Sequence, residues 1–250
     1  MIIAKYLGGS HLYGLSTPDS DVDERIIFAN TEAKNILGLN KFEQEVRNNK
    51  DEDVHKIEIR KFLELARKGN TQSIEVLYAK DYSFDEKSPA LDFLRLNREK
   101  FVDSNRLFKV ISSFIHAQKF LIFDDKRKAE EGSKRATKIN QYGYNPKAAS
   151  TALRLALSGI NFFETGHYQV EMTQSSSAAA VKFHPEDFNA DNIRTMVESL
   201  DNSLKVAYDN TKIKTSFDEN FANRFLLVTY MPHLLSEVTA KDLNGNWLKQ

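Results

Sequence analysis

Two kinds of hydrophobic spacing divide the chain into an early part with strands and a later part with helices. Apolar residues form a short run over residues 2–7, resume over 21–29, and alternate with polar residues over 54–59, which is the spacing of β-strands. Gly8-Gly9 and the turn-forming segment 16–20 separate the first two runs. We therefore expect strands at these three places, a brief helical turn at 10–15 and a surface loop at 41–53.

Helical spacing begins near residue 60 and dominates after Asp103. Good capping residues mark several ends: Gly69 closes one helix, while Asn145-Pro146 opens another that Gly166 closes. The chain order predicts an α+β fold, with a small mixed sheet and flanking helices in residues 1–100 and a mostly helical domain in residues 101–250. The charged segment 124–138 has no apolar stripe and is predicted to be exposed. The expected helices are 60–68, 72–78, one that begins at Asp103, 145–166, 191–209 and 223–238.

Composition narrows the possible functions. Of the 250 residues, 41% are hydrophobic and 28% are charged, which is typical of a globular protein. The 35 basic and 35 acidic residues cancel, so the chain as a whole does not have the basic excess of a non-specific nucleic-acid binder. There are no cysteines, which excludes disulfides, thiolate zinc sites and a cysteine nucleophile. No segment is long enough to span a bilayer and the first residues do not resemble a signal peptide, so we expect a cytoplasmic protein with no membrane partner.

The residues that indicate chemistry lie around the first turn. Gly9 and Ser10 follow the first strand, where unshielded backbone N–H groups and a hydroxyl can hold phosphate oxygens. Asp21 and Asp23 are two residues apart on the next predicted strand, so both carboxylates are expected on one face. Hard oxygen ligands without cysteine favour Mg²⁺ or Mn²⁺ over zinc. This pattern predicts a metal-dependent site that acts on phosphates.

Such chemistry usually needs a third carboxylate. Asp53 and Glu58 flank the predicted strand 54–59, and their spacing of five places them on opposite faces, so only one of them can join Asp21 and Asp23. Arg25 shares the predicted strand face with the two aspartates. It is a candidate for phosphate binding or for a structural salt bridge.

The sequence resembles a known family at three places. The run GGSHLYGLSTPDSDVDERIIF is similar to the Gly-Ser and Asp-x-Asp signature of DNA polymerase beta-type nucleotidyltransferases, and especially to their RNA-ligase-associated branch in bacteria and tailed phages. The runs EIRKFLELARKGNTQSIEVLY and NPKAASTALRLALSGINFFETG resemble later segments of that branch. The resemblance implies a polymerase beta-type palm and Mg²⁺ or Mn²⁺ as cofactor. If a phage encodes the chain, the expected location is the cytoplasm of the bacterial host.

The resemblance also assigns roles to residues. Gly9 and Ser10 would hold phosphates, and Asp21 and Asp23 would bind metal. The third acid would be Asp53, which begins the strand, or Glu58, which precedes the helix, with a slight preference for Asp53. Within the predicted helix 145–166, Lys147 and Arg154 are seven residues apart and therefore on one face; they would face the triphosphate or the acceptor.

The predicted activity is transfer of a nucleoside monophosphate from an NTP to a hydroxyl group, with an RNA end or tRNA as the acceptor that the family suggests. The residues leave two alternatives open. In the first, the acceptor is a protein or a small molecule. In the second, the chain is a nucleotide-binding regulatory module without catalysis.

Overall fold

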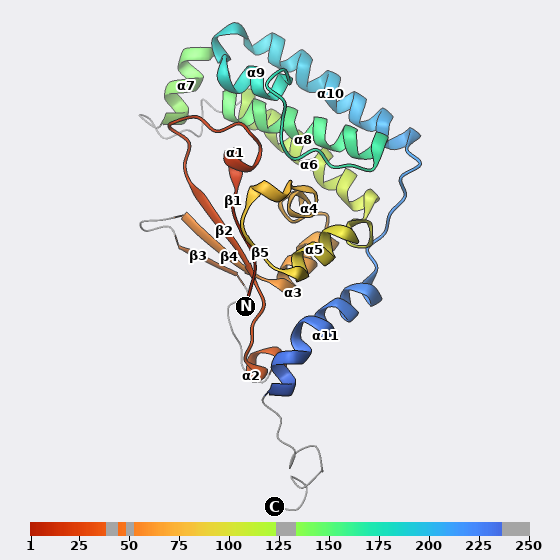
Figure 1. Cartoon of the computed structure of the whole chain (residues 1–250). Coiled ribbons are helices and arrows are strands. Elements are labelled where there is room, and N and C mark those ends of the chain that lie inside the picture. Colours follow the sequence, from red (N-terminus) through yellow and green to blue (C-terminus); the bar gives the residue numbers. More distant parts are fainter. Residues whose placement is uncertain (39–44, 49–52, 124–133, 237–250) are drawn as a thin grey trace, which may run out of the picture.

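The computed structural model describes residues 1–38, 45–48, 53–123 and 134–236. It confirms the α+β class, with one mixed sheet and a mostly helical second half (Figure 1). A single cluster of buried side chains extends from β1 to the last helix and joins the two halves. None of the described helices combines the length and apolarity that a bilayer span requires.

The sheet has five strands in the order β3-β4-β2-β1-β5. β2 and β4 run parallel, and the other neighbours are antiparallel. The parallel pair is central to the site because it sets the first residues of β2 and β4 side by side. The strands are β1 (Ile2–Leu7), β2 (Asp23–Phe28), β3 (Glu45–Asn48), β4 (Asp53–Glu58) and β5 (Phe84–Lys87).

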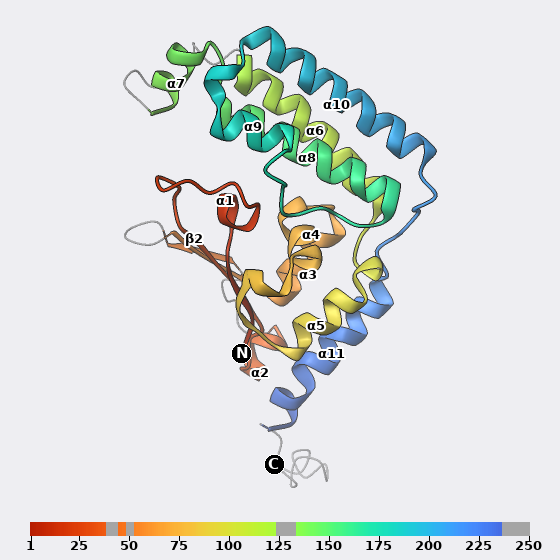
Figure 2. The same ribbon diagram turned by 45° about the horizontal axis from the view of Figure 1, so that its top comes forward.

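Helices α3 (Ile59–Arg67), α4 (Thr71–Tyr78) and α5 (Pro89–Leu96) cover one face of the sheet (Figure 2). Ile27 and Phe62 are almost completely buried in this layer. Gly69 closes α3 with a left-handed φ of 78°, as its sequence position predicted. Two short helices, α1 (Gly9–Leu12) and α2 (Ala33–Ile36), connect strands, and 3₁₀ turns occupy Asp81–Ser83, Arg98–Lys100 and Pro185–Asp187.

The second half is built around α8 (Pro146–Thr165), which packs against α6 (Ser104–Phe123), α9 (Ser177–Phe183) and α10 (Ala190–Asn210). Gly159 permits the closest approach, since a Cβ there would lie 2.7 Å from Leu204 Cδ1. Helix α7 (Lys134–Tyr142) precedes α8 at the end of the bundle, and α11 (Glu219–Ser236) returns to pack beside α5, where Phe93 and Phe221 stack at 5.6 Å.

Three boundary predictions need correction. The predicted loop 41–53 contains β3 and the first residue of β4, while residues 39–44 and 49–52 lie outside the described part of the chain. The predicted exposed segment 124–138 is helical from Lys134 onward, and residues 124–133 lie outside the described part. The second strand begins at Asp23, so Asp21 precedes it.

Candidate active site

The glycine turn lies directly against the start of β2. The Gly8 N–H donates to the Asp23 carbonyl at 2.8 Å. Gly9 has a φ of 59°, and a Cβ at this position would lie only 2.6 Å from Asp23 Oδ2. Only glycine combines this conformation with so close an approach. The turn and the Asp23 carboxylate therefore lie directly against each other.

Ser10 and His11 belong to the same site because both lie on α1, which starts at Gly9. The first N–H groups of a helix have no acceptor within it, so they are available to a ligand. His11 Nε2 is buried and has no hydrogen-bond partner among the described residues. The α1 segment thus presents polar groups whose partners are not supplied by the described protein.

Asp21 is exposed and lies in the connection before β2. Strand alternation therefore does not place it, contrary to the expectation from sequence. A hydrogen-bonded turn precedes it: the Thr17 N–H donates to Ser20 Oγ at 2.8 Å, and the Ser20 N–H donates to the Thr17 carbonyl at 2.9 Å. The charge of Asp21 raises the pKa of Lys182 of α9, against the larger lowering by burial.

The register of the parallel strands separates the two candidates for the third acid. Asp53 pairs with Asp23, whereas Glu58 pairs with Phe28 at the other end of the strands. The backbone of Asp53 is therefore adjacent to that of Asp23, and its side chain lies outside the described part. Five residues of strand separate Glu58 from this position, roughly 16 Å.

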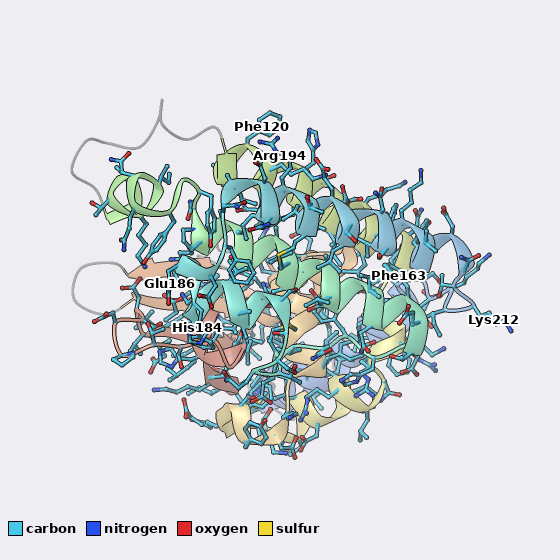
Figure 3. All side chains as sticks on the ribbon, turned by 90° about the horizontal axis from the view of Figure 1, so that it is seen from above. Phe120, Phe163, His184, Glu186, Arg194 and Lys212 are labelled. Carbon is cyan, nitrogen blue, oxygen red and sulfur yellow. The ribbon has the colours of Figure 1, made fainter. Side chains whose placement is uncertain are left out.

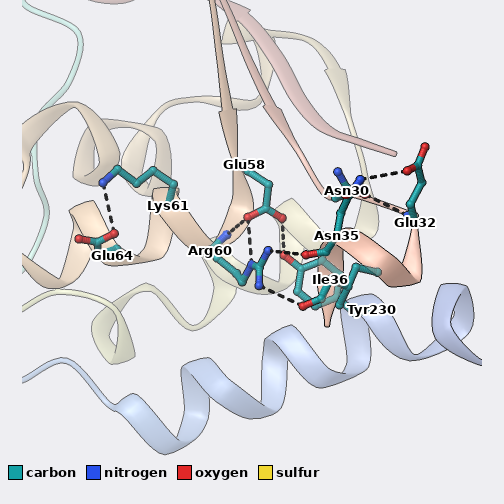
Figure 4. A network of polar contacts seen from close by, with 9 residues as sticks. All are labelled: Asn30, Glu32, Asn35, Ile36, Glu58, Arg60, Lys61, Glu64 and Tyr230. Carbon is teal, nitrogen blue, oxygen red and sulfur yellow. Dashed lines mark hydrogen bonds and ion pairs between the residues drawn. The ribbon is translucent and has the colours of Figure 1, made fainter. Parts of the chain in front are cut away.

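Glu58 instead has the contacts of a structural residue, with hydrogen bonds to neighbouring elements (Figure 4). It is completely buried, and its carboxylate caps α3 by accepting from the Arg60 N–H at 2.8 Å. The Tyr230 hydroxyl donates to its other oxygen, and Arg60 also donates to the Ile36 carbonyl at 3.2 Å. These contacts join α2, α3 and α11. The assignment of Glu58 to the acidic site is corrected on this geometry.

The donor chemistry at the start of β2 suits a hard divalent cation. Asp21 and Asp23 offer carboxylate oxygens, and cysteine is absent from the chain. Among the residues whose side chains are described, no group of three or more histidine, aspartate or glutamate side chains could hold a metal ion. A complete ligand set therefore requires a further donor, and the backbone register makes Asp53 the candidate.

Arg25 has two protein partners. Its Nη1 lies 3.0 Å from His55 Nδ1 and donates to Gln72 Oε1 at 3.3 Å. Its stem fills the space beside Gly8, where a Cβ would lie 2.5 Å from Arg25 Nε. Arg25 thus links the glycine turn to β4 and α4 through hydrogen bonds. No ion pair of Arg25 is found among the described residues, and phosphate binding by Arg25 stays a prediction.

Arg154 is buried, and the prediction that it faces the substrate is wrong. Only 5% of its surface is exposed, and its Nη1 donates to Glu75 Oε1 at 2.8 Å. The Tyr13 hydroxyl donates to the other oxygen of Glu75 at 2.8 Å, and the guanidinium lies 3.5 Å from the centre of the Tyr13 ring. Burial is the main reason that the pKa of Tyr13 is raised, so the hydroxyl keeps its proton and remains a donor. Buried Arg154 and Glu75 and partly buried Tyr13 thus tie the residue after α1 to α4 and α8.

Lys147 is exposed in the first turn of α8, and its contact with the triphosphate or the acceptor stays a prediction. The sequence analysis did not identify Glu75, the buried partner of Arg154. Glu75 had a detectable signal, because it is a carboxylate in the middle of the apolar stretch Ile74-Glu75-Val76-Leu77.

A search of curated proteins finds no match to this chain. A family model matches residues 2–185, and its description is RlaP, the RNA repair pathway DNA polymerase beta family. The match covers the glycine turn, both aspartates, the parallel strand pair and helix α8. Members of the polymerase beta superfamily are nucleotidyltransferases and generally use divalent metals. On this match, which extends over most of its length, the chain belongs to the RlaP family of polymerase beta-type nucleotidyltransferases.

Proposed function

We propose that this protein transfers a nucleoside monophosphate from an NTP to a hydroxyl group at an RNA end. The observation that carries the proposal is the contact between the glycine turn and Asp23, where a Cβ on Gly9 would lie 2.6 Å from a carboxylate oxygen. A phosphate-binding turn and an acid in contact provide one place where a nucleotide phosphate and a cation can meet. The family description, which names an RNA repair pathway, supports RNA as the acceptor.

Each residue of the proposed site has a separate role. The Gly9 backbone and the Ser10 hydroxyl hold phosphate oxygens of the NTP, and Lys147 adds positive charge from α8. Asp21, Asp23 and Asp53 would hold Mg²⁺ or Mn²⁺, which would neutralise charge on the phosphates and make the attacking hydroxyl more acidic. One carboxylate of this set accepts the proton of the attacking hydroxyl. The acceptor oxygen then bonds to the α-phosphorus, the bond from the α-phosphorus to the bridging oxygen breaks, and pyrophosphate leaves.

The two halves of the chain contribute differently to this activity. Residues 1–100 carry the phosphate turn and all three proposed metal ligands. Residues 101–250 carry Lys147 and the helices that lie above α1 (Figure 1). We assign nucleotide chemistry to the first part and binding of the nucleotide or acceptor to the second.

The test is a transfer assay with each α-labelled NTP, Mg²⁺ or Mn²⁺, and three acceptors: short RNA, tRNA and the protein itself. Asp21→Asn and Asp23→Asn should each reduce labelling of RNA by at least about 100-fold, because each removes a charge on which cation binding depends. Asp19→Asn is the matched control: it removes an exposed carboxylate two residues earlier in the same turn and should leave transfer unchanged.

The acceptors separate the remaining functions. Label on protein in place of RNA would replace the proposed acceptor with a hydroxyl side chain. Metal-dependent NTP binding without transfer to any acceptor would refute catalysis and favour a regulatory module. Full activity of Asp23→Asn would refute the proposed site itself.

A further inference from the structure

Tyr82 is the most exposed phenylalanine or tyrosine in the described part of the chain. It lies in the 3₁₀ turn Asp81–Ser83, and 70% of its surface is exposed. Phe120 follows with 56%, and Figure 3 shows it projecting from the outer edge of the helical bundle. Exposure alone is common among surface aromatic residues, so the position and the contacts of Tyr82 decide what it can bind.

The register of the sheet places Tyr82 beside the phosphate turn. β5 begins at Phe84, which pairs with Tyr6 near the end of β1, and β1 leads directly into Gly8 and Gly9. Because β1 and β5 are antiparallel, the residues just before Phe84 lie alongside those just after Tyr6. Tyr82 therefore lies at the edge of the sheet where α1 follows β1 (Figure 1).

A second set of contacts leads from Tyr82 to the same place. The Tyr82 hydroxyl donates to Glu171 Oε2. Glu171 lies against Gly14, where a Cβ would be 3.1 Å from Glu171 Cγ. The Gly14 N–H donates at 3.3 Å to the carbonyl of His11, the residue after Ser10. Two residues thus connect the Tyr82 side chain to the short helix that carries Ser10.

Lys80 holds the ring of Tyr82 from one side. Its Nζ lies 5.4 Å from the centre of the ring and 2.8 Å from Glu171 Oε2. The ion pair offsets the charge of Glu171, which would otherwise repel a phosphate. Because Tyr82 is mostly exposed while Lys80 lies over one face, the opposite face of the ring can receive a flat ligand. A ring held in this way loses little conformational freedom when a ligand binds.

We propose that Tyr82 stacks on a nucleobase, either the base of the NTP whose phosphates bind at Gly9 and Ser10 or a base at the end of the acceptor. The inference rests on the proposed function for the position of these phosphates. Every nucleobase has a π-face, so an aromatic ring beside a phosphate site can bind nucleotides of any sequence. The 35 basic and 35 acidic residues of the chain cancel, which increases the importance of contacts other than charge.

The experiment measures binding by the full chain without transfer. Each NTP is titrated with Mg²⁺ and no acceptor, and a labelled single-stranded RNA of twelve nucleotides is titrated with a chelator and no NTP. Tyr82→Leu should weaken binding of the NTPs or of the RNA by about 5- to 150-fold, which corresponds to the loss of one stacked base. A loss in either titration supports the inference and identifies the source of the base. Phe120→Leu is the matched control at another exposed aromatic residue and should change neither affinity.

Two comparisons separate stacking from support of the turn. Tyr82→Phe loses the hydrogen bond to Glu171 and keeps the ring, and Tyr82→Trp enlarges the ring, so both should retain the wild-type affinity or exceed it. Inorganic tripolyphosphate has no base, so Tyr82→Leu should bind it as the wild type does. If Tyr82→Phe loses as much affinity as Tyr82→Leu, or if tripolyphosphate binding falls as far as NTP binding, Tyr82 acts through Glu171 on the turn and the inference is overturned.

Failure of the inference and failure of the proposed function give different results. Unchanged binding of both NTP and RNA by Tyr82→Leu would overturn the inference, while transfer that depends on Asp23 would leave the proposed function standing. Binding that depends on the Tyr82 ring without transfer to any acceptor would refute the proposed function and leave the stacking residue. A wild-type protein that binds neither NTP nor RNA would overturn both.

Discussion

The buried pair of Arg154 and Glu75 gives the sharpest stability prediction. Arg154→Met removes one partner and leaves a carboxylate whose side chain is 1% exposed, with the Tyr13 hydroxyl as a donor to it. Solvent does not screen this pair, because the Arg154 side chain is only 6% exposed. Loss of one partner from such a pair typically costs about 3–5 kcal/mol. For a chain of ordinary stability, about 5–15 kcal/mol, this is a large fraction of the free energy of unfolding.

The assay is a double-mutant cycle followed by circular dichroism during urea unfolding. Glu75→Gln keeps an oxygen that can accept from Tyr13 and removes the charge. The double variant Arg154→Met/Glu75→Gln buries no unpaired charge, so it should be more stable than Arg154→Met alone by at least about 1 kcal/mol. Met retains most of the volume of the arginine stem, so the cycle reports charge rather than a cavity.

Two results would refute this reasoning. If Arg154→Met costs less than about 1 kcal/mol, the pair is not desolvated in solution as it is in the structure. If the double variant loses the sum of the two single losses, the residues do not interact, and the contact between α8 and α4 does not depend on this bond.

Three other predictions follow from single positions. Gly9→Ala should reduce transfer by at least about 100-fold with an unchanged circular dichroism spectrum, because its Cβ would overlap Asp23 Oδ2 in a left-handed conformation; near wild-type turnover would contradict the described turn. Tyr230→Phe should lower the free energy of urea unfolding by about 1–3 kcal/mol, since Glu58 loses a buried donor; an unchanged midpoint would count against that bond. Burial raises the pKa of Tyr78 to about 12, above the value of about 10 in unfolded chains, so the unfolded state ionises first as the pH rises. The contribution of the buried, neutral Tyr78 to the free energy of unfolding should be complete below about pH 10 and decline between about pH 10 and 12. The urea midpoint of Tyr78→Phe should therefore decline less steeply over this range than that of the wild type. Identical pH profiles of the two proteins would refute the assignment.

Local sequence signals predicted the parts of the fold that depend on local chemistry. The helix from Asn145 to Gly166 has its asparagine cap and left-handed glycine where the sequence placed them. β3 and β5 were not predicted because both are four-residue strands at the edges of the sheet, with polar sequences and no apolar alternation to reveal them. Their pairing comes from the neighbouring strand rather than from their own composition.

The candidate site was predictable only where neighbours in sequence are also neighbours in space. Gly9 and Asp23 meet because a short turn returns the chain beside β1, and this follows from the order of strand, turn and strand. The resemblance gave only a slight preference for Asp53 over Glu58, and the adjacency of Asp53 and Asp23 comes from the parallel register of β2 and β4, which no local pattern specifies. Arg154 was misplaced because a spacing of seven shows that two residues share a helix face, and burial depends on which other helices cover that face.

The contrast between Lys147 and Arg154 suggests how the two halves of the protein are aligned. Seven residues of helix separate them, roughly 10 Å along α8, so a single rigid element carries an exposed cation at one point and a buried cation at the other. Arg154 is held by Glu75 and by the ring of Tyr13, and Tyr13 follows Ser10 by only three residues. The buried pair therefore fixes the position of Lys147 relative to Ser10. Weakening the Arg154–Glu75 pair should misplace the Lys147 ammonium group, so that its binding energy is lost both in the bound ground state and in the transition state. We therefore expect the KM for the NTP to rise more than kcat falls.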